Sequence, residues 1–408
     1  MTLIERVKRR LKNVPAIYDL NAALKSAALS RAVRRVDRSY ADIEIANIDT
    51  SIGAVKKLIA KRVTEAGIQV RTQRAGDLRI FCVGTYYEQE NGGFLQALGR
   101  LGEVVIFQND RGGYGLRGAV SGHDPDIRSG NAACLIDQVK RAHAERPINV
   151  LIGTMVAQNT PLETLQYVRS LGIPVVNIAM DDRLPVHWQR LAEFRYGAIG
   201  LAPATDLVLQ TTPEYVRRYL SDKCPAIFWP FGSDPALFYP AAQKDIDVVF
   251  VGNNYGWRHD LIAAIMKAGV KVEAFGSGFP NGHIDAAQVA EVFGRARIIL
   301  GYGYVAYSRC VTTLKLRDLD GPMAGALYLT SHNPDLALLY EIGKEIETYG
   351  SIGECVDKIV HYLANDEERE RIATAGRTRA LRDHTWDARL RHAFEILGVL
   401  APDSRETR

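Results

Sequence analysis

Short apolar stretches alternate with longer amphipathic ones through most of the chain. From Asp77 onward, stretches of strand length occur at residues 78–83, 104–107, 149–152, 173–180, 207–209 and 227–231. The residues between them place apolar side chains at helical spacing, as in 94–101. Because helices that connect neighbouring parallel strands cross over with one hand, this alternation predicts a doubly wound α/β domain.

One helix start in this domain has a specific signature. Thr160 precedes Pro161, and Glu163 follows at the spacing of a capping box. We therefore expect the Thr160 side chain to cap the N-terminus of a helix.

A second series of the same kind follows a break in the pattern. The break lies at 231–240, where Gly232, Pro235 and Pro240 interrupt the periodicity, so we place the domain junction there. Further strands are expected at 247–251, 270–275, 298–301, 327–330 and 346–349, and helices at 261–268, 285–296, 352–363 and 369–381. Two successive doubly wound, Rossmann-like domains place a cleft between the carboxyl ends of their sheets, where ligands bind in this architecture.

Residues 1–70 have helical apolar spacing without a strand pattern, and their first part is basic. Residues 1–40 hold ten Lys or Arg and three Asp or Glu, a net charge of +7, and because the whole chain carries +4, the remainder carries −3. The basicity is local, so we expect no nucleic-acid partner. A basic helical arm favours peripheral contact with a membrane surface, and the alternative is a solvated extension packed on the next domain.

The composition is that of an ordinary globular protein of 408 residues, with 47% hydrophobic and 24% charged residues. No apolar run approaches the roughly 18–20 residues of a membrane span, and no signal peptide is visible. The cysteines have no disulfide or metal-site spacing and are Cys82, Cys134, Cys224, Cys310 and Cys355. We expect a cytoplasmic protein that the basic arm would hold at the inner face of the cell membrane.

A glycine motif in the first domain matches G-x-G-x-x-G at Gly113–Gly118. A dinucleotide-binding turn of this type leaves the first strand and opens a helix. Here the motif follows the second strand and continues into residues 121–125, which have loop chemistry. We interpret it as a flexible loop, and the alternative is a mobile loop over the cleft.

Glycine-rich exits follow two strands of the second domain. At the first exit Gly252 precedes Asn253, Asn254 and Arg258; glycines let backbone amides approach phosphate, and a guanidinium matches phosphate oxygens. The alternative is a tight turn with a surface arginine. At the second exit the candidates for contacts to a base or ribose are Gly276, Ser277, Asn281, Gly282 and His283, and an ordinary turn is equally compatible.

A third candidate segment is basic and precedes Gly321. Lys315 and Arg317 would neutralise a diphosphate, while Asp320 would accept hydrogen bonds from ribose hydroxyls. A competing interpretation takes Asp318 and Asp320 as a D-x-D metal motif, but the neighbouring cations can replace a metal, so we predict no metal site and no cofactor. The candidates of this segment are Thr312, Thr313, Leu314, Lys315, Arg317 and Asp320.

Two carboxylates follow a strand of the first domain. Asp181 and Asp182 come directly after 173–180, where a carboxylate can act as general base or stabilise developing positive charge. The alternative is a helix cap with a local ion pair to Arg183. We expect His187 to be a satisfied structural histidine. On the acceptor side the candidates after the first strand are Gly84, Tyr86 and Glu90.

These features together resemble GT-B glycosyltransferases, specifically the spore-maturation CgeB/YkvP-like group with its glycosyltransferase family 1-like C-terminal domain. The resemblance covers about residues 78–395. Its most specific stretches are 247–252, 272–276, 314–320, 330–336, 343–346 and 384–386, with an interdomain hinge at 231–238.

The resemblance implies a donor-binding C-terminal domain at 241–384 and an acceptor domain at 76–240, preceded by a helical extension at 1–75. A final helix at 385–408 would cross back onto the N-terminal domain. The donor would be a nucleotide-diphosphate sugar, and the acceptor a glycan, a lipid-linked molecule or another hydroxyl compound in cell-surface polysaccharide or glycoconjugate synthesis. The alternatives are a catalytically degenerate scaffold or binding protein and a nucleotide-sugar epimerase.

Single residues can be transferred from the family only in part. Arg258 falls where such enzymes place a diphosphate-binding cation, and Asp181 falls near a residue that contacts the donor sugar. Asp320 falls on the second Glu of the E-x7-E motif of retaining members, whereas Thr312 replaces the first. The motif is incomplete, so retention or inversion stays open.

Overall fold

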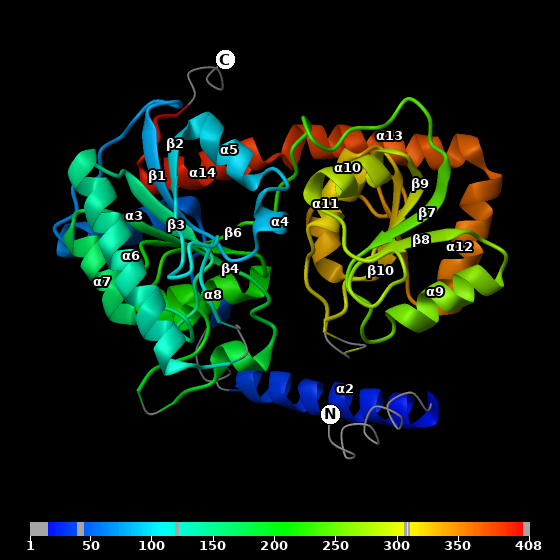
Figure 1. Cartoon of the computed structure of the whole chain (residues 1–408), viewed down its shortest axis with the longest axis horizontal. Helices are drawn as coiled ribbons and strands as arrows, with labels where there is room; N and C mark the ends of the chain where they lie inside the picture. The colour runs from blue at the N-terminus through cyan, green and yellow to red at the C-terminus, as the bar shows by residue number, and fades with distance from the viewer. Residues whose placement is uncertain are drawn as a thin grey trace.

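The computed structural model describes residues 15–38, 45–118, 122–191, 193–305, 308 and 311–402. It contains two α/β domains side by side (Figure 1). The N-terminal domain has one parallel sheet in the order β2-β1-β3-β4-β5-β6. Its strands are β1 (Leu78–Val83), β2 (Gly102–Ile106), β3 (Val150–Gly153), β4 (Val175–Ala179), β5 (Leu207–Gln210) and β6 (Ala226–Phe228). Its helices are α4 (Tyr87–Glu90), α5 (Phe94–Leu101), α6 (Pro125–Glu145), α7 (Leu162–Ser170), η2 (Pro185–Trp188), η3 (Ala198–Ala204) and α8 (Pro213–Ser221).

The C-terminal domain repeats this topology with the order β11-β10-β9-β7-β8. Its strands are β7 (Ile246–Val251), β8 (Val272–Phe275), β9 (Ala296–Leu300), β10 (Leu327–Ser331) and β11 (Glu347–Tyr349). Its helices are α9 (Arg258–Lys267), α10 (Ala286–Gly294), α11 (Arg317–Met323), η4 (Pro334–Leu338), α12 (Ile352–Ala364) and α13 (Asp366–Asp383). Because the strand order reverses between β7 and β9, the carboxyl ends of these two strands are where a ligand is expected.

Amphipathic helices hold each sheet in place. In α5 the buried side chains are Phe94, Ala97, Leu98 and Leu101, which lie on one face of the helix at spacings of three and one residues. Burying a leucine side chain of this kind stabilises a fold by about 1.5–3 kcal/mol. The apolar spacing that predicted this helix is therefore the spacing that packs it.

The junction between the domains is built around one aromatic side chain. Helix α14 (Trp386–Leu397) follows α13 and packs on the N-terminal domain, where α13 and α14 run along one edge of both domains (Figure 1). The Trp386 ring lies 5.3 Å from the Phe94 ring and 5.7 Å from the Trp229 ring, measured between centroids. Burial of three aromatic rings ties the end of the chain to the N-terminal sheet.

Within the described residues, helices α2 and α3 precede the first strand. The 3-10 helix η1 (Ile45–Asn47) comes before helix α3 (Ile52–Glu65). Helix α3 buries Val55, Ile59 and Val63 against the N-terminal domain. Helix α2 (Pro15–Arg38) contacts η2 and extends along the edge of the molecule opposite to α13 (Figure 1). Residues 1–14 of the predicted basic arm lie outside the described residues. Within the described ranges, no helix is both long and apolar enough to cross a membrane.

The predicted cap of α7 is wrong by one residue. The helix begins at Leu162, and its N-cap is Pro161, which makes no side-chain cap. The Thr160 hydroxyl instead donates to Asn159 Oδ1 at 3.2 Å, and its amide bonds to the carbonyl of Val156. Thr160 thus completes the preceding turn, so its hydroxyl is not available to the helix.

Candidate functional site

Two guanidinium groups converge on Gly252 at the carboxyl end of β7. A side chain at this glycine would meet Arg317 Nη1 at 2.7 Å and Arg258 Nη1 at 3.4 Å from its Cβ. Both guanidinium groups lie against the Phe250 ring, at 5.6 Å for Arg258 and 5.2 Å for Arg317. The absence of a side chain at Gly252 therefore leaves room beside two cations at the position where the topology predicts a ligand.

This pair of cations has no salt-bridge partner among the described residues. Arg258 is only 3% exposed, and its guanidinium donates to the Asn253 carbonyl at 2.7 Å and the Tyr255 hydroxyl at 3.2 Å. The Nε atoms of both arginines are buried without a hydrogen-bond partner. Burial, followed by the charge of Arg317, lowers the pKa of Arg258 to about 10. A buried and a half-buried cation that make no salt bridge in the described part of the chain form a site that favours an anion.

The loops after β7 and β8 hold each other in shape. The Asn254 amide donates to the Ser277 carbonyl at 2.8 Å, and the Ser277 amide donates to Asn253 Oδ1 at 3.2 Å. The Gly276 amide bonds to the Gly282 carbonyl at 2.6 Å. These predicted residues are thus brought together around the cation pair, whereas Ser277, Asn281 and His283 present exposed side chains at its rim.

The segment 312–315 reaches the other domain. The Thr313 hydroxyl donates to Asp181 Oδ1 at 2.8 Å, and Lys315 Nζ donates to the same oxygen at 3.1 Å. Leu314 differs from the other candidates of this segment, because it is 3% exposed and packs in the hydrophobic core. We therefore exclude Leu314 from the donor contacts.

Asp318 and Asp320 are both buried. Asp318 accepts from the Tyr328 hydroxyl at 2.5 Å through one carboxylate oxygen and from the Lys315 amide at 2.6 Å through the other. Asp320 is 7% exposed and its Oδ1 has no hydrogen-bond partner in the described part of the chain. Burial raises the pKa of Asp320 well above its usual range, against the opposing effects of Ser233 and Arg317. Asp318 is therefore committed to internal contacts, and no group of three or more metal-binding side chains occurs in the described ranges.

Asp181 lies at the interface between the domains in an uncommon backbone conformation. Its φ is 55°, in the left-handed region that aspartate tolerates better than most residues. Its side chain is 40% exposed. Burial acts to raise the pKa of Asp181, but the charge of Lys315 and the hydrogen bonds from Thr313 and Lys315 outweigh it, so the pKa is lowered. Asp181 is an ionised carboxylate that faces the segment 312–315.

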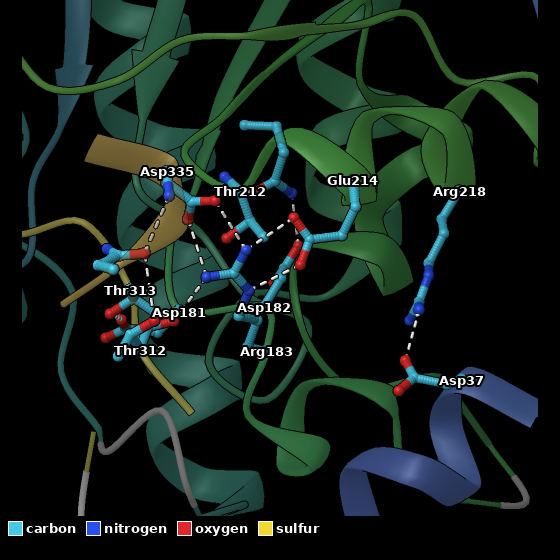
Figure 2. A network of polar contacts seen from close by, with 12 residues as sticks. Asp37, Asp181, Asp182, Arg183, Thr212, Glu214, Arg218, Thr312, Thr313 and Asp335 are labelled. Atoms are coloured by element: carbon cyan, nitrogen blue, oxygen red, sulfur yellow. Dashed lines mark hydrogen bonds and ion pairs between the residues drawn. The ribbon is translucent and has the colours of Figure 1, made fainter. Parts of the chain in front are cut away.

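Asp182 points to the other side, into the N-terminal domain (Figure 2). It is 1% exposed, and its Oδ2 accepts from Gln210 Nε2 and from the Tyr219 hydroxyl, each at 2.7 Å. Burial raises its pKa. These contacts hold the residues after β4 against the interior of the N-terminal domain. The alternative helix cap is also excluded, because the N-cap of η2 is Leu184 and Arg183 pairs with other carboxylates.

His187 differs from the satisfied histidine that we expected. It is 4% exposed, yet its Nδ1 has no hydrogen-bond partner among the described residues. Its backbone amide bonds to the Leu184 carbonyl at 3.0 Å. The side chain of His187 is therefore buried, but its Nδ1 is not satisfied by a hydrogen bond from the described residues.

The acceptor-side candidates form one cluster at the end of β1. Glu90 accepts from the Thr85 amide at 2.9 Å and from the Tyr114 hydroxyl, and burial raises its pKa. The Leu116 amide bonds to the Gly84 carbonyl at 2.9 Å, while Tyr86 is 54% exposed. Tyr114 belongs to the glycine motif at 113–118, which the structure confirms as a loop rather than a helix start. The motif was read correctly, but the contact of its tyrosine with Glu90 was missed.

Sequence reasoning also missed Arg183 as a contact between domains. Its guanidinium donates to the Thr312 carbonyl at 2.7 Å and to Asp335 at 3.0 Å, both in the C-terminal domain (Figure 2). The partner Asp335 lies 152 positions away in the chain. The one signal was the place of Arg183 directly after the candidate carboxylates.

Comparison with known proteins supports the predicted fold, and a family model matches the C-terminal part of the chain. A family model described as glycosyl transferase-like matches residues 236–395, the C-terminal domain with α14. Sucrose-phosphate synthase from Thermosynechococcus elongatus has 13% identity and a TM-score of 0.52, covering 77% of this chain and 96% of that chain. Comparison with curated protein sequences gives no match.

Two further solved structures are similar over the same extent. Alr3699/HepE from Anabaena, in complex with UDP and glucose, has 12% identity and a TM-score of 0.53, covering 78% of this chain and 98% of that chain. A glycosyltransferase from Rickettsia africae ESF-5 has 11% identity and a TM-score of 0.52, covering 79% and 98%. The GT-B fold is therefore confirmed, and the narrower likeness to the CgeB/YkvP-like group stays a prediction.

Proposed function

We propose that this protein is a glycosyltransferase that moves a sugar from a nucleotide-diphosphate donor to a hydroxyl acceptor. The observation that carries the proposal is the convergence of Arg258 and Arg317 on Gly252, where neither guanidinium makes a salt bridge within the described ranges. A diphosphate supplies the missing negative charge, and its oxygens match the fork of a guanidinium. The glycosyl transferase-like match over residues 236–395 contains all of these residues.

The reaction is one substitution at the anomeric carbon. A bond forms between the acceptor oxygen and that carbon, and the bond from the carbon to the diphosphate oxygen breaks. Arg258, Arg317 and Lys315 stabilise the negative charge that develops on the leaving diphosphate. Asp181 is the carboxylate on the opposite domain. We propose that it accepts the proton of the acceptor hydroxyl or stabilises the developing positive charge of the sugar.

We further propose that the acceptor is a glycan or lipid-linked molecule of cell-surface synthesis, reached at a membrane surface through α2. In the described part of α2, Arg31, Arg34, Arg35 and Arg38 are exposed. The end of the helix is fixed to the N-terminal domain by Asp37, which accepts from Arg218 at 2.6 Å (Figure 2). A fixed helix with a cationic outer face is suited to anionic lipid headgroups.

Vesicle flotation tests this contact. Each arginine contributes about 1 kcal/mol near an anionic surface, so Arg31→Glu with Arg35→Glu should weaken binding to phosphatidylglycerol vesicles at least about twentyfold. Reversal of Lys56 and Lys57, which are exposed on α3, is the matched control. If the native chain bound neutral phosphatidylcholine vesicles as tightly as phosphatidylglycerol vesicles, the proposed electrostatic contact would be wrong.

The donor site is tested by the thermal stability of the purified chain with UDP-, GDP-, TDP- and CMP-sugars, with magnesium and with EDTA. A ligand that binds the native state alone raises the midpoint by mass action, and we expect one nucleotide to do so without metal. Arg258→Met should abolish the shift, whereas Arg297→Met, which removes a half-exposed arginine paired with Asp247, should retain it. A chain that no nucleotide stabilises would point instead to a degenerate scaffold.

A further inference from the structure

Arg183 joins the two domains through several hydrogen bonds and ion pairs. On its own domain, Nε and Nη2 donate to the two oxygens of Glu214 at 2.7 and 2.8 Å. Across the interface, Nη1 and Nη2 lie 2.8 and 3.0 Å from the two oxygens of Asp335. Nη1 also donates to the Thr312 carbonyl at 2.7 Å. Every nitrogen of the guanidinium is engaged, and its planar fork fixes the angle between the two carboxylates.

These contacts are shielded from water. The Arg183 side chain is 13% exposed and that of Asp335 is 6% exposed, whereas Glu214 is 47% exposed. Burial acts to lower the pKa of Arg183, but Glu214 and Asp335 outweigh it and raise the pKa. Losing the arginine would leave Asp335 as a buried carboxylate without a cation, so the pair resists separation.

The same segment of the C-terminal domain is held at a second point. The Thr312 hydroxyl lies 3.1 Å from Asn333 Oδ1, which also accepts from the Asp335 amide at 3.2 Å. Three residues further on, Lys315 meets Asp181. Asp181 and Arg183 both follow the end of β4. Arg183 contacts Thr312, whereas Asp181 contacts Thr313 and Lys315. The position of Lys315 therefore depends on the contact that Arg183 makes with Thr312.

We propose that Arg183 is a positioning residue, which fixes the segment 312–315 across the interface so that Lys315 faces Asp181 and the incoming diphosphate. This inference rests on the proposed function. Without donor, Lys315 is held by Asp181. A donor diphosphate attracts the lysine more strongly than one carboxylate does, and its arrival frees Asp181 for the sugar or the acceptor. Arg183 keeps the segment in place during this exchange.

Hydrogen exchange of the ligand-free chain tests the positioning directly. The amides of Val311, Thr313 and Lys315 are bonded at 2.7, 3.1 and 2.6 Å within the C-terminal domain, so they exchange when the segment opens. Arg183→Met should accelerate exchange of the peptide covering 311–316 tenfold or more. Arg183→Lys, which keeps the charge but not the fork, should accelerate it to a smaller extent.

The matched control is Arg169→Met. Arg169 is 14% exposed and binds the buried Asp206 through two nitrogens, but both residues belong to the N-terminal domain. Both methionine variants lose a shielded arginine, and only the change at Arg183 should reach 311–316. Equal acceleration by the two variants, or none by either, would overturn the positioning role.

Calorimetry with UDP and hydrolysis of UDP-glucose separate this inference from the proposed function. Arg183→Met should reduce the rate of UDP-glucose hydrolysis at saturation at least tenfold, while UDP binds within threefold of the native affinity, because Arg258 and Arg317 are unchanged. A tenfold loss of UDP affinity with an unchanged rate would contradict positioning. If UDP does not bind the native chain, uridine is excluded as the base of the proposed donor, whereas the exchange result still decides the role of Arg183.

Discussion

The buried charge of Arg258 predicts that its removal changes the stability of the fold little and weakens donor binding. Burial and the neighbouring Arg317 lower the pKa of Arg258 to about 10, which corresponds to a cost of about 3 kcal/mol for holding the cation in the folded chain. This cost is present at every pH below about 10, because the group is charged in both the folded and the unfolded state there. Replacing Arg258 by methionine removes the cost and keeps most of the apolar stem.

The hydrogen bonds that the substitution removes oppose this gain in stability. Arg258→Met loses two hydrogen bonds from a charged donor, to the Asn253 carbonyl and the Tyr255 hydroxyl, each worth about 1.5 kcal/mol. The gain and the loss in the free energy of unfolding therefore nearly cancel. Donor binding should weaken, because one or two charge-assisted bonds to phosphate disappear at about 1.5–3 kcal/mol each. The Kd for UDP should therefore rise about 100-fold.

Urea denaturation at pH 7 and calorimetric titration with UDP measure the two effects on the same protein. The expected result is a urea midpoint close to that of the native chain together with a weaker UDP complex. Arg297→Met is the control, since its side chain is 42% exposed and pairs with Asp247. If Arg258→Met lowered the urea midpoint and bound UDP with native affinity, Arg258 would be a structural cation, and the phosphate site would have to lie elsewhere.

Three further substitutions separate the roles of buried and interfacial groups. Asp181→Asn should lower the turnover rate about 100-fold or more with little change in the UDP Kd, measured by initial rates and calorimetry, because it removes a carboxylate and not a phosphate contact. Burial lowers the pKa of His384 to about 4, so only the unfolded chain binds its proton between pH 6.5 and 4, and the native protein should lose about 2 kcal/mol between pH 7 and 5 in urea titrations. His384→Gln should lose measurably less over that interval, and an equal loss would assign the effect to other groups. Burial raises the pKa of Asp320, so its contribution to stability declines as pH rises through the folded pKa, and Asp320→Asn should stabilise more at pH 8 than at pH 5.

Elements that depend on local spacing could be predicted from the sequence. The apolar runs at 78–83, 207–209 and 247–251 correspond to β1, β5 and β7, because a strand buried on both faces needs a continuous apolar run. The place of Gly252 at a strand exit and of Arg258 at a helix start followed from the same alternation. The cation pair beside Gly252 was therefore accessible to sequence reasoning through its position in the topology.

Features that depend on side-chain direction or on distant partners could not be predicted. Asp181 and Asp182 are neighbours in sequence, yet one faces the C-terminal domain and the other is buried against Tyr219. Which of the two faces the interface depends on how the chain leaves β4, and the left-handed conformation of Asp181 has no local sequence signal. Leu314 illustrates the same limit, since a residue between polar candidates became part of the core.

The incomplete E-x7-E pattern now has a physical interpretation. Thr312 contributes its carbonyl to Arg183 and its hydroxyl to Asn333, so this position is used for holding the segment rather than for a carboxylate on the donor. Asp320 is buried and favours its neutral form, which can hydrogen-bond a ribose but cannot balance a cation. The charge of the site is therefore carried by Arg258, Arg317 and Lys315. With three cations and one interfacial carboxylate, the site would reach charge balance when the proposed donor diphosphate binds.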